Sequence, residues 1–290
     1  MKLLFKFSLV FILVFGLCIA AASWICKDFL ESNARAQVRR EAELMMESAL
    51  AVRAYTSNQI RPLLEHRHDK VFCPQTVPGY AATETLNFIH AKWPDYTYKE
   101  ATLNPTNPRD RAVEWESDLV SKFRNDAGAK ELTGIRQTAA GGESLFVAHP
   151  IRPSESCLEC HSTAAVAPAS MVRLYGPNNG FNWKLNEVVG AQIVSVPLSV
   201  PKALADTAYR KLMISLVGVA ILTLLALNLV LTFTVIRPVT RLAHAADEIS
   251  KGHLDVPELP ASGSDEIAML AGAFNRMHRS LAKAMKMLDK

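Results

Sequence analysis

The sequence has no dense block of basic residues. Its net charge is only +4 at neutral pH, from 32 Lys and Arg against 28 Asp and Glu, and these charges are spread along the chain. Proteins that bind nucleic acids usually concentrate Lys and Arg in a patch or a stripe. The sequence therefore gives no indication of nucleic acid as a partner.

Charged residues are also missing from residues 212–236, and Lys6 is the only one in residues 3–25. About 20 apolar residues in a helix are long enough to cross a bilayer. We therefore expect two membrane-spanning helices. A cleaved signal peptide is the alternative for the first run, because Lys2 and Lys6 make a basic start, but the run is longer than the apolar region of such a peptide. An uncleaved signal anchor is favoured.

The two apolar runs divide the chain into four predicted parts. These parts are a first transmembrane helix at residues 1–26, an external domain at 27–211, a second transmembrane helix at 212–236 and a tail at 237–290. Lys and Arg are more frequent at the helix ends that face away from the external domain, and this bias places both termini in the cytoplasm.

The external domain shows a mixed α+β pattern with few strands. Hydrophobic periodicity predicts a long helix that continues outward from the first membrane helix and is bent or broken at Pro62. Further helices are predicted at residues 81–92 and 112–125, and strands at 143–148 and 191–196.

Cysteine is scarce, and two of the five cysteines stand in a C-x-x-C-H motif formed by Cys157, Cys160 and His161. Two thiols three residues apart on a helical turn can add to the two vinyl groups of one porphyrin, and the next histidine can reach its iron. A zinc site would need a second pair of ligands, and a redox-active pair would need a thioredoxin-like setting. A structural disulfide is the remaining alternative. The motif favours one covalently bound haem c.

The haem motif also bears on localisation. Haem c is attached after the apoprotein has been translocated across the membrane, in a compartment where its thiols are kept reduced. We therefore expect the external domain to be periplasmic and the protein to be a multi-pass protein of the bacterial inner (cytoplasmic) membrane.

Four blocks of the external domain carry a resemblance to a known family. They are residues 72–89 (FCPQTVPGYAATETLNFI), 98–116 (YKEATLNPTNPRDRAVEWE), 149–168 (HPIRPSESCLECHSTAAVAP) and 175–197 (YGPNNGFNWKLNEVVGAQIVSVP). In this order they resemble the periplasmic c-type haem sensor domain that bacteria place before signalling modules. The resemblance covers roughly residues 65–197 and implies an α+β, PAS-like fold.

The resemblance also implies roles for individual residues. His161 would be the proximal ligand of the haem iron. Some members of the family place a cysteine thiolate opposite this histidine, which makes Cys73 the candidate distal ligand; the alternative is a buried free thiol. Arg109 and Arg111 are candidates for contacts with the haem propionates through their planar guanidinium groups, unless they are merely solvated. The competing distal ligands are His66, His68, His90, His149 and Met171.

The tail resembles a HAMP domain. A first set of apolar positions recurs at alternating steps of four and three residues before Gly252, and a second set keeps a heptad register after Asp265 and Glu266. The two sets are Pro238, Leu242, Ala245 and Ile249, and then Ile267, Leu270, Phe274, Met277, Leu281, Ala284 and Leu288. HAMP helices bury such seams in a parallel four-helix dimer, so we expect a homodimer; an ordinary helical hairpin is the alternative.

Together these features predict a transmembrane haem-based sensor that is not an enzyme. It would detect redox state or a small ligand such as a gas, and would pass the signal through the HAMP domain to a cytoplasmic kinase, cyclase or chemotaxis-type protein supplied in trans. The alternative is a membrane-anchored monohaem c-type cytochrome that transfers electrons. Peroxidase-like catalysis lacks a recognisable distal acid–base pair.

Overall fold

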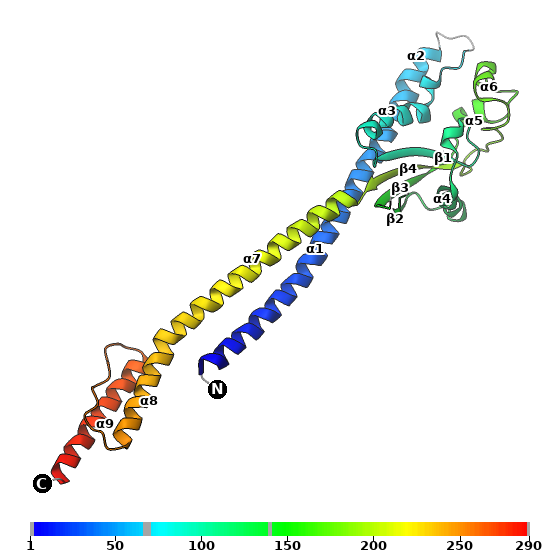
Figure 1. Cartoon of the computed structure of the whole chain (residues 1–290). Coiled ribbons are helices and arrows are strands. Elements are labelled where there is room, and N and C mark those ends of the chain that lie inside the picture. The colour runs from blue at the N-terminus through cyan, green and yellow to red at the C-terminus, as the bar shows by residue number, and fades with distance from the viewer. Residues whose placement is uncertain (1–2, 66–70, 139–140, 289–290) are drawn as a thin grey trace. The chain divides into compact units, whose positions relative to one another are not determined.

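The computed structural model describes residues 3–65, 71–138 and 141–288 of the chain. The chain forms two compact units, one comprising Asp28–Thr207 and the other comprising Met1–Lys27 together with Ala208–Lys290 (Figure 1). The two units are described separately below.

The first unit is built on a four-stranded antiparallel sheet in the order β1-β4-β3-β2. The strands are β1 (Thr97–Thr102), β2 (Leu132–Gln137), β3 (Glu143–Ile151) and β4 (Gly190–Pro197). Every residue of the inner strand β4 is buried, since helices cover both faces of the sheet. The α+β class predicted from the sequence is therefore confirmed for this unit, while a PAS-like fold stays a prediction.

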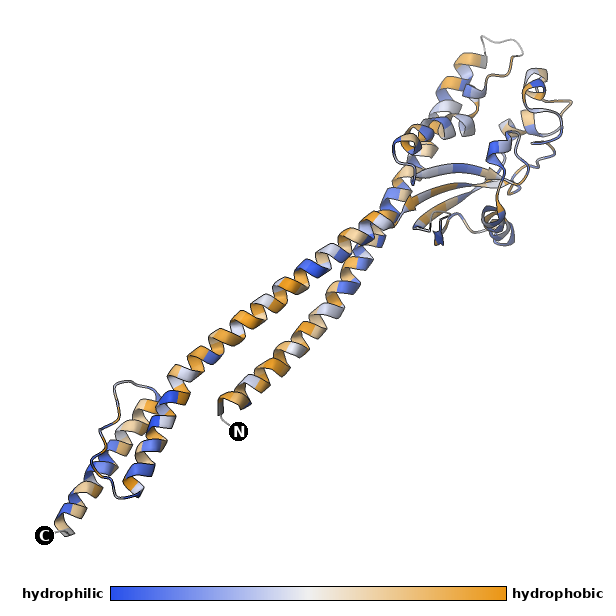
Figure 2. Ribbon diagram, in the orientation of Figure 1, coloured by the Kyte–Doolittle hydropathy of each residue, from blue (hydrophilic) through white to orange (hydrophobic). Residues whose placement is uncertain are grey.

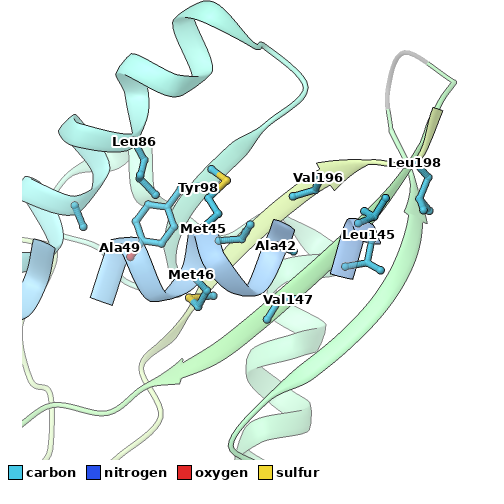
Figure 3. Packing of buried hydrophobic residues seen from close by; sticks show 13 residues of the cluster. Ala42, Met45, Met46, Ala49, Leu86, Tyr98, Leu145, Val147, Val196 and Leu198 are labelled. Carbon is cyan, nitrogen blue, oxygen red and sulfur yellow. The ribbon is translucent and has the colours of Figure 1, made fainter. Parts of the chain in front are cut away.

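One face of the sheet packs against the helices α1 (Leu3–Tyr55) and α3 (Pro78–Lys92). Ala42, Met46 and Ala49 of α1 lie against Val147 and Val196, among others (Figure 3). Ala42 and Ala49 are fully buried, and their small side chains allow the helix to approach the strands closely. The opposite face packs against α4 (Glu114–Asn125), whose buried residues are Glu116, Leu119, Val120 and Phe123.

The long outward helix is interrupted close to the predicted place. After Tyr55 a π-helical turn, η1 (Thr56–Ile60), leads into the short helix α2 (Arg61–Glu65). Pro62 has no N–H to donate to a preceding carbonyl, and its ring crowds the preceding turn of a regular helix. The chain accommodates the proline by forming the wider π-helical turn just before it.

Four further short elements of this unit precede the first strand or connect the strands. They are η2 (Pro74–Thr76), η3 (Pro108–Asp110), α5 (Glu155–His161) and α6 (Ala169–Tyr175). The predicted helices at 81–92 and 112–125 correspond to α3 and α4, and the predicted strands correspond to β3 and β4. Strands β1 and β2 were not predicted.

The second unit contains the most apolar parts of two helices that are long and apolar enough to cross a membrane; the candidate spans are Leu4–Leu64 and Ser199–Ser250. The hydrophobic residues of α1 and of α7 (Ser199–Leu231) are coloured orange in Figure 2. Within this unit Ser8 Oγ donates to Asn228 Oδ1 at 2.7 Å, and the Ser23 and Tyr209 hydroxyls lie 2.6 Å apart. A π-helical turn, η4 (Thr232–Ile236), follows α7.

The tail forms two helices joined by an extended linker, α8 (Arg237–Ser250) and α9 (Glu266–Leu288). Gly252 follows α8 with a φ of 89°, a left-handed conformation that glycine adopts without strain. The Asp265 side chain accepts from Ala268 N at 2.7 Å and so caps α9. Asn275 bonds both backbone groups of Leu259, at 3.0 and 2.8 Å, and holds the linker on α9.

Candidate functional site

The short helix α5 carries all three residues of the C-x-x-C-H motif. Cys157 and Cys160 lie one turn apart on this helix, so their side chains leave it on the same side. Neither forms a disulfide, and both are partly buried. The Ser154 hydroxyl lies 3.4 Å from the Cys157 sulfur at the start of the helix.

The motif faces a cavity of about 890 Å³ within the first unit. This volume lies in the range of pockets that hold cofactors and other small molecules, roughly 300–1,000 Å³. Cys157, Cys160 and His161 line part of its wall, and other parts come from the end of α1, from η1 and α2, and from the segment that begins at Val71.

His161 is held in one orientation by its neighbours. Its Nδ1–H donates to the Gly180 carbonyl at 2.6 Å, and its ring stacks on Trp183 with the ring centroids 4.0 Å apart and the planes 9° from parallel. With the proton on Nδ1, Nε2 is available as a ligand. Burial lowers the pKa of His161, which favours the neutral imidazole that binds metals.

Gly180 is required by this arrangement. Its φ of 82° is in the left-handed region, and a Cβ atom there would come within 2.0 Å of Thr106 Oγ1. The same Thr106 hydroxyl lies 3.4 Å from His161 Nδ1. A side chain at position 180 would therefore displace the loop that orients the histidine.

Cys73 lines the same cavity as His161, although the two residues are far apart in the sequence. It immediately precedes η2 and is partly buried. The preceding residue, Phe72, packs against the apolar cluster of Ala167, Met171 and Phe181, which anchors this segment beside the cavity. The fold thus brings the two predicted iron ligands, His161 and Cys73, to one cavity.

The competing distal ligands are placed differently. Met171 lines the cavity and is buried in the same apolar cluster. His90 and His149 do not line it; His90 lies 3.2 Å from the Tyr96 carbonyl, and His149 lies 3.3 Å from a Glu131 carboxylate oxygen. His66 and His68 lie outside the described residues.

The two arginines predicted to contact propionates also differ. Arg109 lines the cavity, but its guanidinium already pairs with Glu84 and, at 3.4 Å, with Asp110, and it lies over the Tyr80 ring. Arg111 is not part of the wall, and its guanidinium lies 3.4 Å from Asn179 Oδ1. Both guanidinium groups thus already have partners within the protein.

Three other arginines of the wall, Arg53, Arg61 and Arg152, were not predicted from the sequence. Arg53 at the end of α1 pairs with Glu100 of β1, and Arg61 of α2 pairs at 2.6 Å with Glu159, which stands between the two motif cysteines. Arg53, Ser57 and Arg61 recur every four residues along one side of the helical segment. This spacing is the sequence signal that could have indicated a shared face.

Asp110 is the most strongly perturbed acid of the wall. Burial raises the pKa of its carboxyl to about 6, against the smaller opposing effect of the neighbouring Arg109 cation. Its charge therefore changes between mildly acidic and neutral pH.

Comparison with known families assigns the domains. Residues 31–197, more than half of the chain, match the family described as Tll0287-like. The chain belongs to the Tll0287-like family. Residues 230–283 match the HAMP domain, which overlaps α8 and α9. The prediction from the sequence, a domain of this family followed by a HAMP domain, is confirmed.

Two further comparisons concern individual proteins. Among solved structures, the cyanobacterial heme-protein Tll0287 matches with 15% sequence identity and a TM-score of 0.40, over 56% of this chain and 93% of its own. No curated protein matches this chain significantly.

The cavity of the Tll0287-like domain is chemically suited to a haem. The two thiols on α5 could bond the porphyrin edge, the neutral His161 could bind iron through Nε2, and Cys73 could approach from another part of the wall. The hydrogen bond from His161 to Gly180 is the kind of support that orients metal-binding histidines.

Proposed function

We propose that this protein is a transmembrane sensor with one haem c in its Tll0287-like domain, and that it is not an enzyme. The observation that supports this most strongly is the common cavity: the C-x-x-C-H motif, Cys73 and the end of helix α1 all line it. A change at the iron site would act directly on α1, the helix that also includes the first candidate membrane span.

Each residue of the site has a defined task in this proposal. Cys157 and Cys160 would form the thioether bonds, His161 would bind the iron through Nε2, and Cys73 would bind it as a thiolate. Bound haem supplies reversible one-electron chemistry and a site for small gaseous ligands. A thiolate favours the oxidised iron. The stimulus would therefore be the redox state or a gas, because either would decide whether Cys73 remains bound to the iron.

The topology belongs to the same proposal. The haem domain lies in the periplasm and both termini lie in the cytoplasm, which makes the protein a multi-pass protein of the bacterial inner membrane. Supporting this are the two apolar helices on either side of the Tll0287-like domain, the distribution of Lys and Arg at their ends, and the site of haem c attachment.

Signal output would pass through a HAMP homodimer. Leu270 and Leu281 of α9, two of the predicted seam positions, leave 50% and 42% of their surface exposed in one chain. A parallel partner would bury these side chains, and the resulting bundle can exist in two arrangements that the haem domain biases. The output would be a cytoplasmic kinase, cyclase or chemotaxis-type protein acting in trans.

Haem attachment is the first test of this function. The full chain is produced in bacteria that assemble haem c, and the denatured protein is stained for haem after electrophoresis. The wild-type band should stain, and the double variant Cys157→Ala/Cys160→Ala should not. An unstained wild-type band, with the polypeptide present, would refute the proposal.

Gas binding then separates the sensor from the electron-transfer cytochrome. Carbon monoxide is added to the reduced full-length protein, and the absorption spectrum is recorded. A sensor whose distal ligand leaves should show the spectrum of a carbon monoxide adduct. An unchanged spectrum from a stable six-coordinate iron would favour the cytochrome instead.

A further inference from the structure

Arg53 and Glu100 form an ion pair in the wall of the cavity, although neither was expected in the site. Arg53 Nη1 donates to both carboxylate oxygens of Glu100, at 2.6 Å for Oε2. The two side chains are only 27% and 13% exposed. A pair this shielded from water exerts a stronger field on its surroundings than a surface pair does.

Neighbouring residues of the first unit hold the Glu100 side of the pair in place. The Tyr98 hydroxyl donates to Glu100 Oε1 at 2.7 Å, and burial together with the Glu100 charge raises the pKa of Tyr98, so the phenol keeps its proton. Gly79 leaves room for the carboxylate, because a Cβ atom there would lie 2.5 Å from Glu100 Oε2. Glu100 therefore has little freedom to follow Arg53 if the helix moves.

Arg53 also lines the cavity that contains the C-x-x-C-H motif, together with Cys157. It belongs to the last turn of α1, which runs without interruption from Leu3 to Tyr55. Arginine keeps its positive charge at every relevant pH.

We propose that the Arg53–Glu100 pair acts electrostatically on the haem iron, Arg53 favouring its reduced form and Glu100 its oxidised form, and that this pair makes α1 responsive to the charge of the iron. The inference rests on the proposed haem site. Reduction adds one electron from the reductant to the iron and forms or breaks no bond in either side chain. A nearby cation stabilises that added negative charge, whereas an anion opposes it.

The coupling works in both directions. If the position of Arg53 changes the equilibrium between oxidised and reduced iron, then the redox state changes the stability of that position by the same factor. Reduction thus strengthens the attraction of the Arg53 end of α1 to the site, and oxidation weakens it. Glu100, fixed on the sheet, keeps the second charge in place.

The test is a redox titration in detergent of the full-length protein that carries its haem. Arg53→Gln should lower the midpoint potential and Glu100→Gln should raise it, each by about tenfold in the equilibrium constant, or about 59 mV for one electron. The double variant should return close to the wild type, and Arg53→Lys, which keeps the charge, should stay near it. Loss of a purely structural ion pair would not shift the midpoint potential in opposite directions in the two variants.

Arg39 provides the matched control. It is also an arginine of α1 with two acidic partners, Glu43 and Glu131, but it does not line the cavity. Arg39→Gln should leave the potential unchanged.

The failures of the two proposals are distinguishable. An unstained wild-type band refutes the haem function itself. A stained protein in which Arg53→Gln and Glu100→Gln leave the potential unchanged, or shift it in the same direction, overturns only the inference about the pair. If Arg53→Gln does not accumulate, Glu100→Gln decides by the sign of its shift.

Discussion

The Tll0287-like domain and the HAMP domain differ in how far their apolar side chains are buried. In the first, Phe123, Val147 and Val194 are completely buried between a sheet and helices of the same chain. In the second, Met277 and Leu281 are 57% and 42% exposed although they belong to the heptad pattern of α9. The haem domain can therefore complete its core alone, whereas the HAMP helices have an apolar face that a second chain would cover.

Polar groups differ between the two regions as well. Around the cavity, charged side chains meet across elements, as in the pairs Arg53–Glu100 and Arg61–Glu159. In the HAMP domain the buried polar residues Asn275 and His278 instead bond backbone groups of the linker. A largely buried ion pair thus lies beside the cavity, whereas the buried polar residues of the HAMP domain form uncharged hydrogen bonds to the linker.

The largest effect is expected from emptying the core of the haem domain. Phe123→Ala removes a fully buried ring between α4 and the sheet, and should cost about 3–5 kcal/mol of unfolding free energy. Thermal unfolding of the full-length protein in detergent measures the loss. Leu185→Ala, at a position 47% exposed in the same domain, is the control and should change stability little; equal losses would contradict the assigned core.

The next effect concerns the exposed face of the HAMP domain. The tail has no native cysteine. Single cysteines introduced at Leu270 or Leu281 should form disulfides between two chains under mild oxidation, because seam positions of a parallel dimer face each other. Dimer bands on non-reducing electrophoresis report the reaction. Ala268→Cys is the off-seam control, and cross-linking there but at neither leucine would refute the predicted register.

Cys73 links the comparison to the haem. Cys73→Ser should leave the haem attached through Cys157 and Cys160, change the ferric absorption spectrum from a low-spin thiolate type, and raise the reduction potential, because a negatively charged ligand of the oxidised iron is lost. Spectra and a redox titration of the full-length protein provide the measurement. A variant identical to the wild type in both would exclude Cys73 as ligand and bring forward Met171, which lines the same cavity.

The smallest effect is a pH dependence that Asp110 of the haem domain should produce. The pKa of Asp110 is about 6 in the fold against 3.8 for the free side chain, so the folded state holds the proton more tightly. Between these values the unfolding free energy falls as the pH rises, and the loss persists above pH 6. Asp110→Asn should therefore stabilise the protein at pH 8, by about 1–2 kcal/mol after allowance for partial exposure.

The comparison of thermal unfolding at two pH values completes this test. At pH 4 the Asp110→Asn variant and the wild type should be close in stability, because the wild-type carboxyl is then largely protonated in the fold. A stabilisation of equal size at pH 4 and pH 8 would mean that the charge of Asp110 is not its cause.

The predicted elements show where sequence patterns suffice. Helices α3 and α4 and strands β3 and β4 have clear hydrophobic patterns, and all four were predicted near their observed bounds. Strand β1 was missed because its residues, TYKEAT, are mostly polar. Strand β2 contains Gly134, which weakens a strand signal; there the Phe146 ring fills the space, since a Cβ atom would lie 2.8 Å from it.

The sequence by itself determined the features that depend on neighbours along the chain. The spacing of Cys157, Cys160 and His161, the two apolar runs and the heptads of the tail are properties of single helices, so they can be read without knowledge of the fold. Only the tertiary structure decided that Cys73, Arg53 and Glu100 share one cavity with the motif, while Arg111, His90 and His149 lie outside its wall. These residues come from segments far apart in the chain, and their proximity results from packing on both faces of the sheet, which local patterns do not specify.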